Sequence, residues 1–212
     1  MRTLGLLFCV GLLAGCISVL PEEPAPAKKI VLIPKLRHKI VGHKIESYSI
    51  LESLIVEKPR MLESLDSARV KIVLHGQDGV TSSEFVAGIE WSDKLPSFLQ
   101  ETLISLYERT GKITAVGRAE EQFYAPYRLQ FTITNFEIVK EADASMKVVV
   151  KVSAKVINSQ NRSVLAQHSF HQQVAVKEEG LEGIIKAFEK ATSVSFSEII
   201  QWTFEKIKRE KR

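Results

Sequence analysis

The chain has 212 residues, 45% of them hydrophobic and 25% charged, which is the composition of a globular protein rather than of a collagen-like or disordered one. The 29 basic residues against 25 acidic ones leave a net charge of +4, too small for the basic footprint of a nucleic-acid-binding protein. Both cysteines, Cys9 and Cys16, lie in the first sixteen residues, so a disulfide framework or a thiol active site in the rest of the chain is excluded.

The N-terminus has the pattern of an export signal. A basic residue, Arg2, precedes an apolar run at 4–13 that is shorter than the roughly 20 residues of a spanning helix. The run ends in four residues that resemble the lipobox of bacterial lipoproteins: Leu13, Ala14, Gly15 and Cys16. Residues 1–15 are therefore predicted to be a signal peptide that is removed. Cys16 is predicted to become the first residue of the mature chain and to carry a lipid that anchors the protein in a membrane.

Residues 16–47 are predicted to be the lipidated N-terminus and a flexible tether. Prolines at 21, 24 and 26 favour an extended stem, and a basic stretch follows them that either contacts anionic head groups or is a solvated linker. A short strand at 30–33 is an alternative to the tether over these residues. By resemblance to the sorting rule of Gram-negative lipoproteins, Ile17 in the place of aspartate favours the periplasmic face of the outer membrane, with the inner membrane as the alternative.

Residues 48–212 are predicted to form one domain that begins with short strands. Residues 69–74 and 80–86 are β-type runs on either side of the turn sequence at 76–79, which predicts a hairpin. Residues 129–133 alternate between apolar and polar, but Phe136 and Ile138 fall on the opposite parity, so we expect a β-bulge near Asn135.

Two further strands and two helices complete the prediction. Residues 146–156 have the clearest alternation in the chain, and a turn at 158–161 leads to a partner strand at 164–176. Helices are predicted after Trp91, ending near Gly111, and from 181 to 207. The order of elements indicates an α+β fold in which two main helices pack on one face of an antiparallel β-sheet.

The sequence holds no recognisable catalytic or metal-binding set. His168 and His171 lie on opposite faces of a predicted strand, and His38 and His43 have no cysteine or acidic companions, so no metal site is predicted. Neither a nucleophile elbow nor a phosphate-binding glycine loop occurs. We therefore expect a protein that is not an enzyme and needs no cofactor.

Three aromatic residues are candidates for a partner-binding surface. Phe85 lies in the predicted hairpin, and Trp91 stands at the entrance of the first helix, where it either staples the helix or contributes to a binding surface. Trp202 and the phenylalanines around it do not all fit one face of the last helix, so an aromatic surface is predicted there unless the helix is buried on both sides. Such a surface would serve a partner protein or a second copy of the chain.

Several strings, in order behind the lipobox, resemble the ABC-type transport auxiliary lipoprotein family. They cover the chain from residue 48 to about 204. They are LIVEKP at 54–59, LDSARV at 65–70, LPSFLQ at 95–100 after Trp91, YRL at 127–129, VIN at 156–158 and VLA at 164–166.

This resemblance implies a non-enzymatic envelope lipoprotein. Its partner would be the periplasmic mammalian-cell-entry (MCE) domain protein of an ABC transporter that moves phospholipid or other hydrophobic molecules between the inner and outer membranes. The alternative is a tethered lipoprotein that regulates a cell-wall synthase, because a stem of about thirty extended residues reaches roughly 100 Å, enough to cross peptidoglycan.

Overall fold

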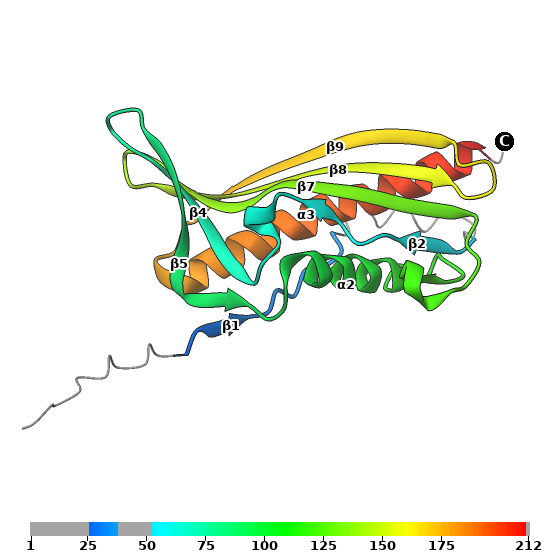
Figure 1. Cartoon of the computed structure of the whole chain (residues 1–212), viewed down its shortest axis with the longest axis horizontal. Coiled ribbons are helices and arrows are strands. Elements are labelled where there is room, and N and C mark those ends of the chain that lie inside the picture. The colour runs from blue at the N-terminus through cyan, green and yellow to red at the C-terminus, as the bar shows by residue number, and fades with distance from the viewer. Residues whose placement is uncertain (1–25, 38–51, 211–212) are drawn as a thin grey trace, which may run out of the picture.

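The computed structural model describes residues 26–37 and 52–210, and it is organised around one long strand, β7 (Figure 1). Nine strands form one sheet: β1 (Lys28–Ile30), β2 (Leu54–Val56), β3 (Arg60–Met61), β4 (Arg69–His75), β5 (Thr81–Trp91), β6 (Val116–Gly117), β7 (Tyr127–Lys140), β8 (Met146–Asn158) and β9 (Val164–Ala175). The two α-helices are α2 (Leu95–Glu108) and α3 (Gly180–Glu210), and 3₁₀ turns occur at 63–65 and 119–121. The expected α+β class is therefore confirmed.

The sheet is mixed, which corrects the expectation of a purely antiparallel sheet. The hairpins β4–β5, β7–β8 and β8–β9 are antiparallel, as their short turns require. The edge of β7 opposite β8, however, pairs with three short strands one after another. These strands are β2, β3 and β4, and all three run parallel to β7. Side chains alternate in the same way in parallel and antiparallel strands, so the sequence pattern alone does not distinguish the two kinds of pairing.

The expected bulge in β7 is present. The register between β7 and β8 shifts between Ile133 and Asn135, so Thr134 is the extra residue. Before the bulge Phe131 and Ile133 point into the core, and after it Phe136 takes over the same face. One extra residue is enough to move all later side chains of the strand to the opposite face, because the side chains of a strand alternate with a period of two.

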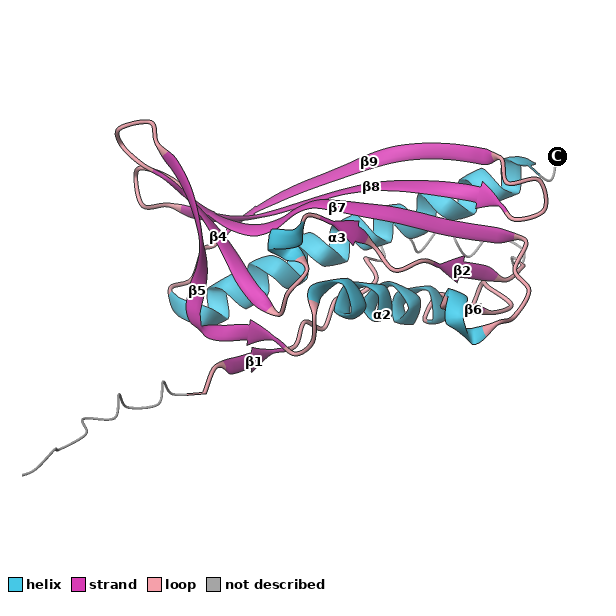
Figure 2. Cartoon of the chain, in the orientation of Figure 1, coloured by secondary structure: helices cyan, strands magenta, loops and turns pink. Residues whose placement is uncertain are grey.

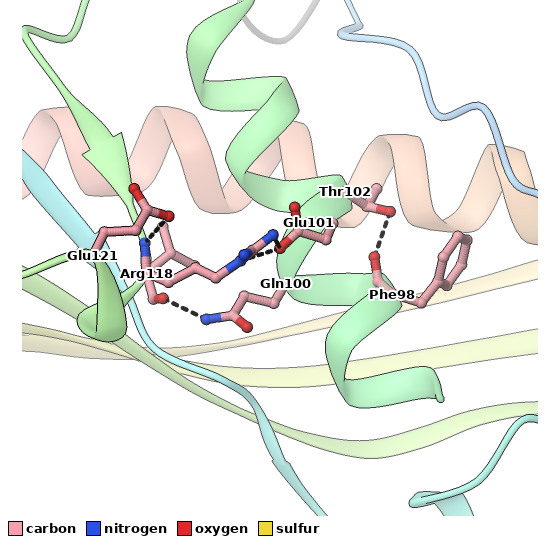
Figure 3. A network of polar contacts seen from close by, with 7 residues as sticks. Phe98, Gln100, Glu101, Thr102, Arg118 and Glu121 are labelled. Atoms are coloured by element: carbon pink, nitrogen blue, oxygen red, sulfur yellow. Dashed lines mark hydrogen bonds and ion pairs between the residues drawn. The ribbon is translucent and has the colours of Figure 1, made fainter. Parts of the chain in front are cut away.

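Both helices cover the inner face of the sheet (Figure 2). α3 packs along β8 and β9, and α2 packs between α3 and the strands β2 and β6. Polar contacts fasten α2 to its neighbours: the buried Gln100 amide donates to the Val56 carbonyl at 2.9 Å, and Arg118 beyond β6 pairs with Glu101 (Figure 3). The first helix is thus held at the side of β2 by groups on two consecutive residues.

The residues at 28–37, which we call the strap, pack against the domain although they lie in the stretch predicted as tether. β1 pairs with β5, and the chain then runs along α3. The amides of Ile33, Lys35 and Arg37 donate to side chains of α3 at distances of 3.0–3.1 Å. The acceptors are Glu189 Oε1, Ser193 Oγ and Ser197 Oγ.

The hydrogen bonds between the strap and α3 follow a regular spacing because the two segments advance by similar distances. Two residues of extended chain advance about 6.6 Å, and four residues of α-helix advance about 6.0 Å. Alternate strap amides therefore meet acceptors spaced four apart on the helix. Three of the other strap residues, namely Ile30, Leu32 and Pro34, are buried against the core side.

We predict that the strap loosens when its hydrogen-bond acceptors are removed. The double variant Ser193→Ala, Ser197→Ala should speed amide hydrogen exchange at Lys35 and Arg37 by about fivefold each, because a net hydrogen bond contributes about 1 kcal/mol. Lys190→Ala, on an exposed position of the same helix, is the control and should change neither amide. Unchanged exchange in the double variant would show that the acceptors do not hold the strap.

We also predict a large stability loss from truncating the aromatic centre of the core. Phe188 is fully buried and lies 4.9 Å from Trp91 and 5.0 Å from Phe136 between ring centroids. Phe188→Ala should lower the free energy of unfolding in denaturant by about 3–5 kcal/mol, since it removes a buried ring and leaves a cavity. Val164→Ala, at an exposed position, should change it by no more than about 0.5 kcal/mol.

Candidate functional site

The predicted lipidation site lies outside the described residues. Leu13, Ala14, Gly15 and Cys16 all belong to residues 1–25, and the rest of the predicted tether, 38–47, is also outside the described part. Their roles stay predictions from the sequence.

Burial removes both tryptophans from the candidate partner surface. Trp91 is completely buried, with its ring centroid 6.1 Å from Phe98 and 5.4 Å from Phe136, so it has the role of a structural staple. Trp202 is buried between α3 and β9, where it packs edge-on against Phe170. The last helix is therefore covered on both sides over this stretch, and the aromatic surface expected there is not exposed.

Phe85 differs from the two tryptophans because its side chain is only half-buried. The Arg69 guanidinium lies 3.8 Å from the centre of its ring, a cation–π contact across β4 and β5. The three predicted residues are thus not brought together: two belong to the core, and Phe85 belongs to the base of the hairpin.

The β4–β5 hairpin leaves the body of the molecule as a two-stranded ribbon, which we define as residues 71–85 (Figure 1). The register shifts between Arg69 and Lys71, and the opposite strand accommodates the shift over residues 86–89. Gly88 lies there with a φ of +73°, a conformation that other residues rarely adopt. The shift lets Trp91 enter the core while the ribbon points away from it, and residues 81–84 at the outer end are exposed on both faces.

The ribbon tip and the β7–β8 turn enclose a surface hollow of about 520 Å³. Its walls come from two hairpins, with Val80 and Leu74 on one side and Ala142 and Ala144 on the other. Val80 is 60% exposed, so the rim is partly apolar. A hollow of this size has room for a side chain of a partner protein.

An ion-pair cluster joins the two hairpin tips. Glu141 accepts from His75 Nδ1 at 2.7 Å through one oxygen and pairs with Lys147 Nζ at 2.7 Å through the other. The hydrogen bond from Lys147, followed by that from His75, holds the pKa of the Glu141 carboxyl below its ordinary value. Sequence reasoning missed these three residues, because their meeting depends on the parallel pairing of β4 with β7, which the side-chain pattern did not reveal.

A second, less exposed pair supports the ribbon at its base. Lys71 Nζ lies 2.9 Å from a carboxylate oxygen of Glu137, and the Asn135 amide donates to the other oxygen at 2.6 Å. Both charged side chains are largely buried. Removing one partner would leave a buried charge uncompensated, so this pair orients the ribbon relative to β7.

Strand β9 offers a second kind of surface. Among the described strands it pairs only with β8, so one of its edges carries backbone groups not used in the sheet over 12 residues. Such an edge is a template for pairing with another strand. His168 and His171 lie on opposite faces of this strand, as expected, because His168 packs on Phe170 while His171 contacts Gln173.

The described residues show no arrangement suited to metal binding. Within 26–37 and 52–210, no three histidine, cysteine or acidic side chains lie close enough to hold a metal ion. Neither α2 nor α3 combines the length and the hydrophobicity that a membrane span requires. The ribbon and its hollow remain as the candidate site.

The sequence pattern of one protein family, the ABC-type transport auxiliary lipoprotein component, matches residues 46–199. The chain belongs to this family. The match begins after the strap and extends from β2 into α3, so it covers the ribbon and every described strand except β1. No match is found among curated proteins.

Solved structures share the fold of this auxiliary lipoprotein. A DUF330-family protein from Xanthomonas campestris has a TM-score of 0.68 at 20% identity, with 87% of this chain and 97% of that chain covered. An uncharacterised protein has a TM-score of 0.57 at 16% identity, with coverages of 73% and 94%. The PelC dodecamer from Paraburkholderia phytofirmans is more distant, with a TM-score of 0.45, 13% identity and coverages of 73% and 91%. The first two similarities show the fold alone.

We predict that the ion-pair cluster stabilises the protein at neutral pH and not in acid. The pKa of Glu141 is lower in the folded chain than its ordinary value of 4.5, so the stabilisation is present above that pH and is lost as the pH falls through the folded pKa. Glu141→Gln should therefore lower the free energy of unfolding at pH 7. It should leave that free energy unchanged at a pH so low that Glu141 is protonated in both the folded and the unfolded protein. Thermal unfolding of both proteins over a pH series measures this.

The control is Glu84→Gln, which removes an exposed carboxylate from the same ribbon. An equal pH-dependent effect of both substitutions would show that net charge, rather than the His75–Glu141–Lys147 cluster, causes the change.

Proposed function

We propose that this chain is the non-enzymatic lipoprotein component of an MCE-type ABC transporter, which moves phospholipid or other hydrophobic molecules between the inner and outer membranes. In this proposal a lipid on Cys16 anchors the protein at the periplasmic face of the outer membrane. The observation that carries it is the family match over 46–199 behind a lipobox-like sequence at 13–16.

The periplasmic MCE-domain protein is the proposed partner, and the ribbon is its proposed contact. Three observations support this choice. The ribbon exposes both faces at its tip, the hollow beside it has a partly apolar rim, and the ion pairs of Glu137 and Glu141 keep both hairpins in a fixed relation. A preorganised protrusion loses less conformational entropy on binding than a flexible loop.

Self-association is a second candidate role for the free edge of β9. Edge strands of this length pair readily with an identical strand, and antiparallel pairing would join two copies without any change in either fold. Lysine and proline commonly protect an edge strand from such pairing. Residues 164–175 contain neither.

Native affinity purification of the lipidated protein from its own envelope tests the function. We expect an MCE-domain protein to co-elute, identified by mass spectrometry together with bound lipids. A cell-wall synthase in the eluate without any MCE protein would contradict the transporter role and favour the regulatory alternative.

The contact is tested by Val80→Glu at the ribbon tip. We expect this variant to lose the MCE protein from the eluate, since a carboxylate at the rim of the hollow would have to be desolvated on binding. Leu62→Glu is a matched control, because Leu62 is also 60% exposed but lies outside the ribbon. Loss of the partner in both variants, or in neither, would show that the ribbon is not the contact.

A further inference from the structure

The outward face of the strap carries two exposed aliphatic side chains. Val31 and Ile33 are 58% and 59% exposed, and as alternate residues of an extended segment they point in the same direction. The residues between and around them, Ile30, Leu32 and Pro34, are buried. The strap therefore uses its inner face for the core and keeps two branched aliphatic side chains in solvent.

This exposed face belongs to the folded domain. The backbone of the strap is tied to α3 by amides on both sides of Pro34, and the Ile30 carbonyl accepts from the Ser92 amide at 2.9 Å. On the other side, Arg109, the residue that follows α2, donates to the Pro34 carbonyl. Val31 and Ile33 are thus held in place at a defined side of the molecule.

The charges around the two aliphatic residues are basic. Residues 26–37 contain Lys28, Lys29, Lys35 and Arg37 and no acidic residue. Of the acidic residues that approach the strap, Glu90 pairs with Lys29 at 2.5 Å, whereas Glu189 accepts the uncharged Ile33 amide and keeps its own charge. Glu101, beside Ile33 in a shallow groove of about 290 Å³, pairs with Arg118.

The strap is also close in sequence to the predicted anchor. Lys28 lies twelve residues after Cys16, which corresponds to at most roughly 40 Å of fully extended chain. Any less extended path brings the strap nearer to the membrane that holds the lipid. Exposed aliphatic side chains flanked by lysine and arginine are the pattern of a surface that lies in the head-group region of an anionic bilayer.

We propose that the outward face of the strap, with Val31 and Ile33 at its centre and Lys28, Lys35 and Arg37 around them, rests on the anionic phospholipid surface of the membrane. This inference rests on the acylation of Cys16 in the proposed function but not on the identity of the protein partner. It orients the domain: Figure 1 shows β1 and the ribbon tip at opposite sides of the molecule, so the ribbon points away from the membrane that the strap contacts.

Site-specific fluorescence on the lipidated, full-length mature protein tests this contact. Cys9 and Cys16 are the two cysteines of the chain, so after removal of the signal peptide and acylation of Cys16 an introduced cysteine is the single free thiol. Val31→Cys is labelled with a polarity-sensitive dye in vesicles of phosphatidylethanolamine and phosphatidylglycerol. We expect a blue shift of the dye and quenching by lipids that carry a spin label near the head group.

Val164→Cys is the matched control, because Val164 is 56% exposed and lies at the start of β9. Its dye should show neither the shift nor the quenching. Adding Lys28→Glu, Lys35→Glu and Arg37→Glu to the Val31→Cys protein should abolish the quenching. Circular dichroism verifies that this charge-reversed protein is folded.

Three results would overturn the proposal. Equal quenching at positions 31 and 164 would mean that the anchor merely keeps the whole domain near the bilayer. No quenching at position 31, although mass spectrometry shows an acylated Cys16, would place the strap away from lipid. Protection of the Val31 dye in detergent that depends on protein concentration would mean that a second copy covers this face. None of these results bears on whether an MCE protein co-purifies, so failure of this inference is distinguishable from failure of the proposed function.

Discussion

The structure depends on one aromatic contact in which four elements each place a ring. Trp91 comes from the end of β5, Phe98 from α2, Phe136 from β7 and Phe188 from α3, with centroids 4.9–6.1 Å from Trp91. Because interiors are packed as densely as organic crystals, none of these elements can shift without opening a void at this point. The ends of the first hairpin, both helices and the central strand are therefore positioned by the same cluster.

Two irregularities in the strands make this contact possible. The extra residue Thr134 in β7 brings Phe136 to the inner face, where a regular strand would have turned it outwards. The register shift at 86–89 in β5, with Gly88 in a left-handed conformation, lets Trp91 reach the core while the ribbon bends away. The core and the protruding ribbon are thus two consequences of the same local departures from regular pairing.

Local patterns predicted much of this fold, and the long-range pairings are what they missed. The hairpin turn at 76–79, the bulge beside Asn135 and the last helix were all predictable, because each leaves a signal within a few residues. The parallel pairing of β2, β3 and β4 with β7 leaves none, since direction does not alter side-chain alternation. The strap was interpreted as tether for a related reason: its acceptors lie more than 150 residues away in α3.

The candidate surfaces at the two sides of the molecule are connected through neighbours of the aromatic cluster. Glu90, which pairs with Lys29 of the strap, immediately precedes Trp91, and Glu189, which accepts the Ile33 amide, immediately follows Phe188. The strap is therefore fixed by the residues adjacent to the rings that also fix the base of the ribbon. Because the interior is close-packed, the strap and the base of the ribbon are held in one orientation relative to each other. In the proposed arrangement, such a body would set the orientation of the partner relative to the membrane without any moving part of its own.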